Sequence, residues 1–265
     1  MFEYEFMQNA FMAGFLVALL SPTVGLFIVL KRYSMIGDTL SHSTFAGVAI
    51  GLVLGYNPLI VAFIYTTLCA VIIEFLRNYY KRYAEMVMSI ILTFSLGIAI
   101  MLVSSGKASA NINSFLFGSI LTVTKSDIIM IAAVTIISFL LIGILYDKLI
   151  YVTFDEEGSG TLGVQVKLIN YIFTIMVGAA ISVSIRVMGI LVISSVMIVP
   201  VATALQFKQG FKRSLIISII IGLIDIMSGL VLSYMLDTAP GGTIAVISVI
   251  VLIIAIVISN INKKS

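Results

Sequence analysis

SMIGDTLSHSTFAGVAIGLVLG, residues Ser34–Gly55, is the most informative stretch of this sequence because it holds the only histidine, His42. His42 follows Asp38 by four residues, so on a helix the imidazole and the carboxylate lie on the same face. The opposite face carries three glycines, Gly47, Gly51 and Gly55. Small residues at this spacing let a second helix approach closely. We therefore expect a helix with one polar stripe that could bind an ion and one glycine stripe that packs against a neighbour.

The composition places this helix in a membrane protein. The chain has 265 residues, of which 61% are hydrophobic and 10% charged, and its mean hydropathy is +1.21. Such a chain exposes most of its apolar surface to lipid. Its apolar runs are long and continuous rather than short and alternating, which predicts an all-α, polytopic membrane protein. We expect one transmembrane domain, residues 1–265.

The apolar runs predict about nine membrane spans, with eight as the alternative. Their expected bounds are Phe6–Leu30, Ser34–Gly55, Leu59–Leu76, Ala84–Ser104, Asp127–Tyr146, Leu168–Ile185, Ile190–Gln206, Leu215–Leu236 and Thr243–Ile261. Residues 106–126 are too polar and too short to cross, and are expected to form a loop with a short re-entrant or surface helix. Residues 148–167 are expected to form a long loop.

The distribution of positive charge predicts the orientation. With nine spans and the N-terminus outside, the C-terminus is inside. Of the 15 lysines and arginines, this arrangement leaves only Lys107, Lys125 and Arg186 outside. Cytoplasmic loops of membrane proteins are enriched in such residues, so we expect this orientation in the cell membrane.

Several functions are excluded by absent motifs. The chain has no G-x-x-x-x-G-K-[ST] loop for ATP and no H-E-x-x-H metalloprotease pattern. A single histidine within an apolar span also gives no basis for a Ser/His/Asp triad. We therefore expect neither enzymatic activity nor a nucleic-acid partner.

Asp38 and His42 supply one oxygen and one nitrogen ligand, a combination that suits zinc, manganese or iron. One chain offers too few ligands here for a closed site, but two copies facing each other would supply four. Ligation requires a neutral imidazole and an ionised carboxylate, so acid should weaken it. Three readings stay open at this point: an ion path, a packing or helix-capping role, and a proton relay.

Two other acidic features stand out. Asp225 lies inside the eighth expected span, where it could bind a metal or pair with a neighbouring helix or water. The acidic run Asp155-Glu156-Glu157 lies in the long loop at 148–167. That loop is either a solvated surface or a docking element for a cytoplasmic partner.

The run from Leu30 to Gly47, LKRYSMIGDTLSHSTFAG, resembles the signature of the ABC-3 family of metal-ion permeases, the membrane subunits of bacterial zinc, manganese and iron importers. The resemblance extends over nearly the whole chain in the right order. Its further segments are 116–120, 154–163, 189–204 and 229–241. The match is most similar to the zinc permeases, including the FDEE sequence at 154–157.

This resemblance implies a permease that works as a homodimer and holds no permanently bound cofactor. It implies that Zn²⁺, or Mn²⁺ or Fe²⁺, is transported along a path lined by Asp38 and His42, and we expect Asp237 to help receive the ion or its carrier at the outer surface. Cytoplasmic ATPase subunits would dock on the 148–167 loop, and an extracellular metal-binding protein would deliver the ion. The residues expected to couple to the ATPase are Phe154, Asp155, Glu156, Glu157 and Gly163.

Two other classes compete with this interpretation. A cation transporter driven by an ion gradient would need no ATPase. A permease for a larger metal chelate would need a wide path without a tight pair of ligands.

Overall fold

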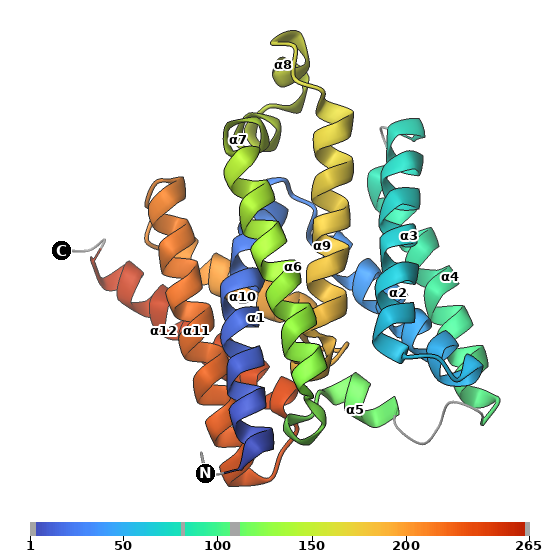
Figure 1. The fold of residues 1–265 in the computed structure, drawn as a ribbon. Helices are drawn as coiled ribbons and strands as arrows, with labels where there is room; N and C mark the ends of the chain where they lie inside the picture. The colour runs from blue at the N-terminus through green and yellow to red at the C-terminus, as the bar shows by residue number, and fades with distance from the viewer. Residues whose placement is uncertain (1–3, 81–82, 107–111, 263–265) are drawn as a thin grey trace.

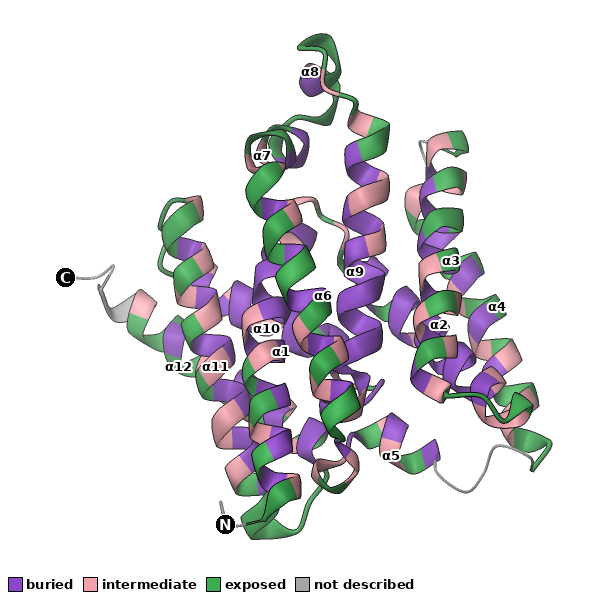
Figure 2. Cartoon of the chain, in the orientation of Figure 1, coloured by how far each residue is buried: buried purple, intermediate pink, exposed green. Residues whose placement is uncertain are grey.

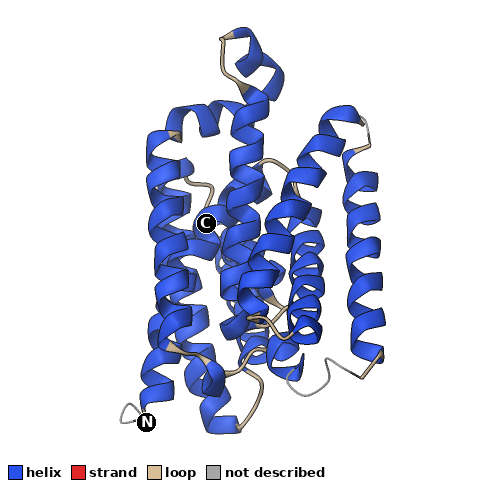
Figure 3. Cartoon of the chain, turned by 45° about the vertical axis from the view of Figure 1, so that its right-hand side comes forward, coloured by secondary structure: helices blue, strands red, loops and turns tan. Residues whose placement is uncertain are grey.

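The computed structural model describes residues 4–80, 83–106 and 112–262. Within these ranges the chain forms helices joined by turns, with no strand (Figure 3). Five basic residues used in the charge argument lie outside the described residues: Lys81, Arg82, Lys107, Lys263 and Lys264. The expected all-helical class is confirmed.

The helices follow one another through short connections (Figure 1). They are α1 (Glu5–Leu30), α2 (Ser34–Leu54), α3 (Pro58–Tyr79), α4 (Ala84–Ser104), α5 (Ile112–Phe117), the 3-10 turn η1 (Ile120–Thr122), α6 (Lys125–Ile144), α7 (Tyr146–Phe154), α8 (Glu156–Thr161), α9 (Val166–Met188), α10 (Ile193–Leu205), α11 (Phe211–Leu236) and α12 (Pro240–Asn262). Local chemistry sets several starts. Asn57 caps α3 ahead of Pro58, and Thr124 and Asp127 form a capping box at α6.

In the described chain, seven helices are long and apolar enough to cross a membrane: α1, α3, α4, α6, α9, α11 and α12. The expected count of nine spans is therefore not confirmed. Helix α10 has 13 residues, which at about 1.5 Å per residue reach about 20 Å, less than the roughly 30 Å hydrocarbon core. Helix α2 has 21 residues but carries too many polar side chains to join this set.

Helix α9 joins two groups of helices. It packs against α1 and α6 on one side and against α2 and α3 on the other (Figure 1). Helices α1, α6, α10, α11 and α12 form the first group, and α2, α3 and α4 form the second. In the most apolar windows of α1 and α9, 72% of the residues are buried, compared with 22% in α12 (Figure 2). The outer helices therefore present apolar surface to lipid, while α1 and α9 are core elements.

The expected loop at 148–167 instead contains α7 and α8, and α8 projects from one end of the bundle (Figure 1). Helix α8 forms although Gly158 and Gly160 disfavour a helix. Asp155 compensates by capping it, because its Oδ1 accepts a hydrogen bond of 2.8 Å from the Gly158 amide. Ser159 Oγ also donates to the Asp155 carbonyl at 2.5 Å. The Asp155 cap and the Ser159 hydroxyl thus stabilise a helix within the segment that was expected to be a loop.

Two of the three glycines of the α2 stripe contact α3 closely. A Cβ atom added at Gly47 would lie 2.5 Å from the Ala62 Cα, and one added at Gly51 would lie 2.8 Å from the Pro58 Cα. Gly55 differs from the expectation of a packing role. It ends α2 with a left-handed φ of 72°, and an added Cβ would meet no atom within 4 Å.

Candidate functional site

Asp38 and His42 lie in the first turns of α2, on the part of its surface that the rest of the chain leaves uncovered. Asp38 is exposed and His42 is half-buried, while the residues between them are buried. The Nδ1 atom of His42 is itself buried and has no hydrogen-bond partner among the described residues. Tyr33 is the N-cap of α2, and no side chain caps that helix. Neither a capping role for Asp38 nor an interhelical hydrogen bond for His42 is therefore supported by the contacts.

Transition-metal sites in proteins are usually built from sets of histidine, cysteine, aspartate and glutamate side chains. In the part of the chain that the structure describes, no group of three or more histidine, cysteine, aspartate or glutamate side chains could hold an ion. A tetrahedral zinc site normally takes four ligands. Asp38 and His42 therefore have no third histidine, cysteine, aspartate or glutamate beside them among the described residues.

Asp237 lies beside the start of α1, whereas Asp38 and His42 lie on α2, which follows the end of α1. Asp237 caps the C-terminal end of α11 and lines a cavity of about 290 Å³ together with Phe6, at the beginning of α1. Asp38 follows the other end of α1, and α1 has 26 residues, which span about 39 Å. The structure thus brings Asp38 and His42 together on α2, while Asp237 lines a cavity that includes neither of them.

Asp225 pairs with a neighbouring helix. It is fully buried, and its Oδ2 accepts a hydrogen bond of 2.7 Å from Ser248 Oγ of α12. Its Oδ1 has no partner among the described residues. Of the two readings of Asp225 from sequence, the contact supports pairing between helices.

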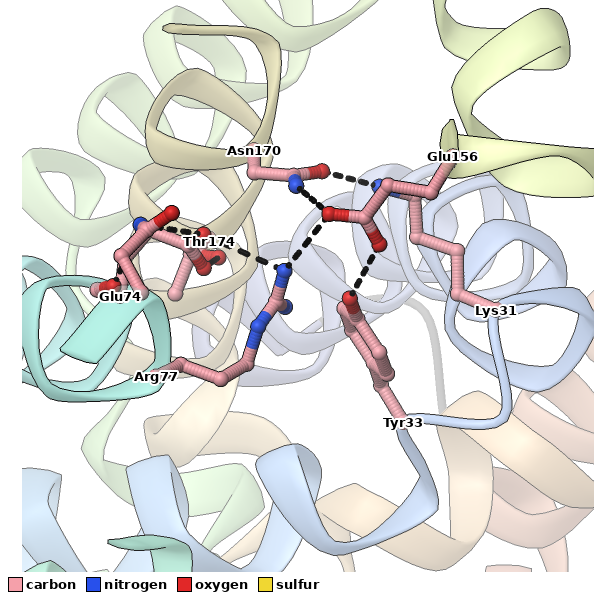
Figure 4. A network of polar contacts seen from close by, with 8 residues as sticks. Lys31, Tyr33, Glu74, Arg77, Glu156, Asn170 and Thr174 are labelled. Carbon is pink, nitrogen blue, oxygen red and sulfur yellow. Dashed lines mark hydrogen bonds and ion pairs between the residues drawn. The ribbon is translucent and has the colours of Figure 1, made fainter. Parts of the chain in front are cut away.

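Glu156, from the acidic run, takes part in a partly buried polar network (Figure 4). The Oε1 atom of Glu156 accepts hydrogen bonds from Asn170 Nδ2 at 2.8 Å and from an Arg77 NH group at 3.4 Å. Its Oε2 atom accepts a hydrogen bond from the Tyr33 hydroxyl at 3.4 Å. We call Lys31, Tyr33, Glu74, Arg77, Glu156, Asn170 and Thr174 the Glu156 network. It joins α8 to α3, to α9 and to the residues between α1 and α2.

The deeper half of the Glu156 network is centred on Glu74. This carboxylate is fully buried and pairs with Arg77 at 3.3 Å. It also accepts a hydrogen bond of 3.3 Å from Thr174. Lys31 donates to the Asn170 Oδ1 at 2.6 Å. The network therefore holds two cations and two carboxylates, so its formal charge is balanced as long as Glu156 is in place.

Burial changes the acidity of two groups between α1 and α2. Burial and, to a smaller degree, the positive charge of Arg77 lower the pKa of the Lys31 amine to about 8, against the raising effect of Glu156 and Glu74. Burial likewise raises the pKa of the Tyr33 hydroxyl well above its usual range. Tyr33 therefore stays protonated and can donate to Glu156 at neutral pH.

Sequence reasoning missed most of this network. One signal was present: Glu74 and Arg77 lie three residues apart at the end of an apolar span, where a carboxylate is costly unless it is paired. Their partners could not be identified in the same way, because Glu156 and Asn170 are distant in sequence.

A second charged contact lies at the opposite end of the molecule. An Arg186 NH group donates to the Thr122 carbonyl at 3.0 Å, and its Nε lies 3.6 Å from the Asp127 Oδ2. The guanidinium also lies 5.0 Å from the centre of the Phe115 ring. A Cβ atom added at Gly189 would lie 2.5 Å from the Leu116 carbonyl oxygen. These contacts hold α5 and η1 against the turn between α9 and α10.

Comparisons with known proteins agree with this architecture. Residues 3–259 match the model of the ABC 3 transport family. The chain is 43% identical to a probable metal transport system membrane protein of Treponema pallidum, over 99% of both chains. It is 30% identical to the high-affinity zinc uptake system membrane protein ZnuB of Buchnera aphidicola, over 98% of both chains. Other relatives are named for manganese import and chelated iron transport.

Among solved structures, PsaBC from Streptococcus pneumoniae, in complex with Fab, is similar with a TM-score of 0.84 and 27% identity. The match covers 96% of this chain and 91% of that chain. The family model and the relatives both cover nearly the full sequence. The chain therefore belongs to the ABC 3 transport family, as a multi-pass membrane permease of a metal ABC importer.

Proposed function

We propose that this permease moves a divalent transition metal ion, Zn²⁺, into the cell by alternating access, and that separate ATPase subunits hydrolyse ATP to drive it. One observation carries the proposal. Asp38 and His42 lie one turn apart on an uncovered face of α2, and the buried His42 Nδ1 has no partner among the described residues. An exposed carboxylate beside a half-buried imidazole, with no partner for Nδ1 among the described residues, is suited to a transported ion in a membrane protein.

The number of ligands supports a homodimer. Two copies of α2 facing each other would bring two carboxylates and two imidazoles to one ion. A doubly charged cation would offset two ionised aspartates, which are costly in an apolar environment when unpaired. Such a site is also suited to release, because its ligands come from two subunits that can separate.

Zinc is the preferred substrate in this proposal because two carboxylate oxygens and two imidazole nitrogens form the four-ligand set that zinc favours. A zinc uptake protein is also among the relatives at 30% identity. Mn²⁺ and Fe²⁺ accept the same donor atoms, and relatives named for both are similar to this chain. Measuring the uptake of each of the three ions separately tests which of them this permease transports.

The two ends of the molecule would bind different partners. Helix α8 projects from the bundle and is flanked by Phe154 and Leu162, whose side chains are 64% and 74% exposed. Exposed apolar side chains on a projecting helix suit docking of an ATPase subunit. This assignment places α8 and the C-terminus in the cytoplasm and the N-terminus outside. The cavity beside Asp237 would then face an extracellular receptor protein that delivers the metal.

The test is metal uptake by cells that produce Asp38→Asn or His42→Ala at membrane levels equal to wild type. We expect each variant to lose at least about ten-fold in uptake of radioactive zinc, because each removes one ligand type from both subunits. Glu85→Gln, at an exposed position of α4, is the control and should transport normally. Unimpaired zinc, manganese and iron uptake in both site variants would reject the assignment. Uptake that survives removal of the ATPase would instead indicate a gradient-driven transporter.

A further inference from the structure

One carboxylate of helix α8 reaches three residues of other elements of the bundle. Helix α8 has six residues and projects from the end of the molecule (Figure 1). The side chain of Glu156, its first residue, is 47% exposed, yet it reaches Arg77, Asn170 and Tyr33. Arg77 lies on α3, Asn170 lies on α9, and Tyr33 is the N-cap of α2 (Figure 4).

The contact with Tyr33 involves the residue just before the helix that carries the expected ion path. Tyr33 is the N-cap of α2. Asp38 and His42 follow it by five and nine residues, so they lie about 7 and 13 Å further along the helix axis. The Tyr33 ring is also held from the other side, because the Arg77 guanidinium lies 4.3 Å from its centre. Tyr33, the residue before α2, is therefore contacted both by Glu156 and by Arg77, which Glu156 also contacts.

The carboxylates that pair with Arg77 in this network are Glu74 and Glu156. Without Glu156, Lys31 and Arg77 would share the single buried carboxylate of Glu74. One Arg77 NH group already lacks an acceptor among the described residues. Removing Glu156 takes one of two carboxylates from Arg77, whose side chain is only 9% exposed, and a charge buried with less compensation is less stable. A displacement of α8 that withdraws Glu156 would thus disturb Arg77 and Tyr33 together.

We infer that Glu156 is a positioning residue that transmits movement of α8 to the start of α2. While Glu156 contacts Tyr33, Arg77 and Asn170, the Asp38–His42 segment is held in one orientation. When a partner pulls on α8, Glu156 leaves, and the start of α2 is released to move. The inference rests on the proposed function for the identity of that partner, but the link between Glu156 and α2 is a property of this chain alone.

The experiment compares Glu156→Ala with wild type and with Glu85→Ala, an exposed glutamate of α4. Hydrogen–deuterium exchange of residues 34–42 is measured on the full chain in lipid nanodiscs, with and without its ATPase. Zinc uptake per ATP hydrolysed and co-purification of the ATPase are measured on the same variants. Glu156→Gln, which keeps an acceptor for Asn170 but removes the charge, serves if Glu156→Ala does not fold.

We expect Glu156→Ala to speed exchange at residues 34–42 by about ten-fold, because local opening there becomes easier. It should retain the ATPase but lower uptake per ATP by about ten-fold, while Glu85→Ala matches wild type. Unchanged exchange at residues 34–42 would overturn the inference. Loss of the ATPase from the complex would also overturn it, since Glu156 would then be a docking contact. If wild type transported no metal, the proposed function would fail, but the exchange measurement would still decide this inference.

Discussion

Thr66 Oγ1 of α3 donates a hydrogen bond of 2.9 Å to Thr44 Oγ1 of α2, deep in the interface between these helices. One residue earlier on α2, Ser43 shares a hydrogen bond of 3.0 Å with Ser95 of α4. Interhelical hydrogen bonds of this kind, together with close glycine contacts, stabilise helix association where lipid replaces water. Helix α2 is therefore held against α3 and α4 along its buried faces, while Asp38 is exposed and His42 is half-buried on its remaining face.

Substitution of Gly47 should weaken this interface. In Gly47→Ala, the added Cβ would lie 2.5 Å from the Ala62 Cα, so α2 and α3 must separate, at a cost of about 1–3 kcal/mol. Gly97→Ala is the matched control, because a Cβ there meets no atom within 4 Å. It should be neutral or stabilising by up to about 1 kcal/mol. Thermal unfolding of both variants in the same detergent measures the difference, and equal melting temperatures would contradict the packing role.

Loss of Ser248 should leave Asp225 without its hydrogen-bond donor. Because Asp225 is fully buried, we expect Ser248→Ala to destabilise the protein by about 1–3 kcal/mol. Ser228→Ala on α11 is the control, since the Ser228 hydroxyl bonds carbonyls of its own helix. Metal uptake at matched protein levels should be similar in both variants. A specific loss of uptake in Ser248→Ala at unchanged stability would indicate that Asp225 belongs to the ion path.

Docking of the ATPase should depend on α8 and its flanking apolar side chains. Deletion of residues 155–163 is expected to abolish co-purification of the ATPase. The double variant Phe154→Ser and Leu162→Ser should weaken it, because both side chains are more than half exposed and would lose apolar contact with a partner. Tyr79→Ser, at a position 74% exposed on α3, is the control. Retained association after the deletion would exclude α8 as the docking element.

Because the Lys31 amine is buried, we expect the free energy of unfolding to depend on pH in the alkaline range. The pKa of this amine is lowered from 10.5 to about 8 in the folded protein, so folding releases a proton between these values. The unfolded state binds more protons in this window, and Lys31 therefore contributes more favourably to stability as the pH rises from about 8 to 10.5. The melting temperature of wild type relative to Lys31→Met should increase over this range. A constant difference would show that the amine titrates normally.

The amino-acid sequence by itself determined the class of the protein and the pair of candidate ligands. Long apolar runs can satisfy their backbone hydrogen bonds in lipid only as helices. The spacing of Asp38 and His42 places both on one face of any helix that contains them. The Leu30–Gly47 run indicated a metal permease family, and the match over residues 3–259 confirmed it. All of these features depend on local periodicity, composition or a continuous motif, which a sequence displays directly.

Only the tertiary structure revealed which polar groups are paired. Glu156 meets Arg77, 79 residues away in the sequence, and Asp225 meets Ser248 on the next helix. Charges inside a membrane protein are stabilised by partners that the packing of whole helices brings within reach. Because that packing joins residues distant in sequence, no local pattern could identify Glu156 as the residue that connects α8 to the start of α2.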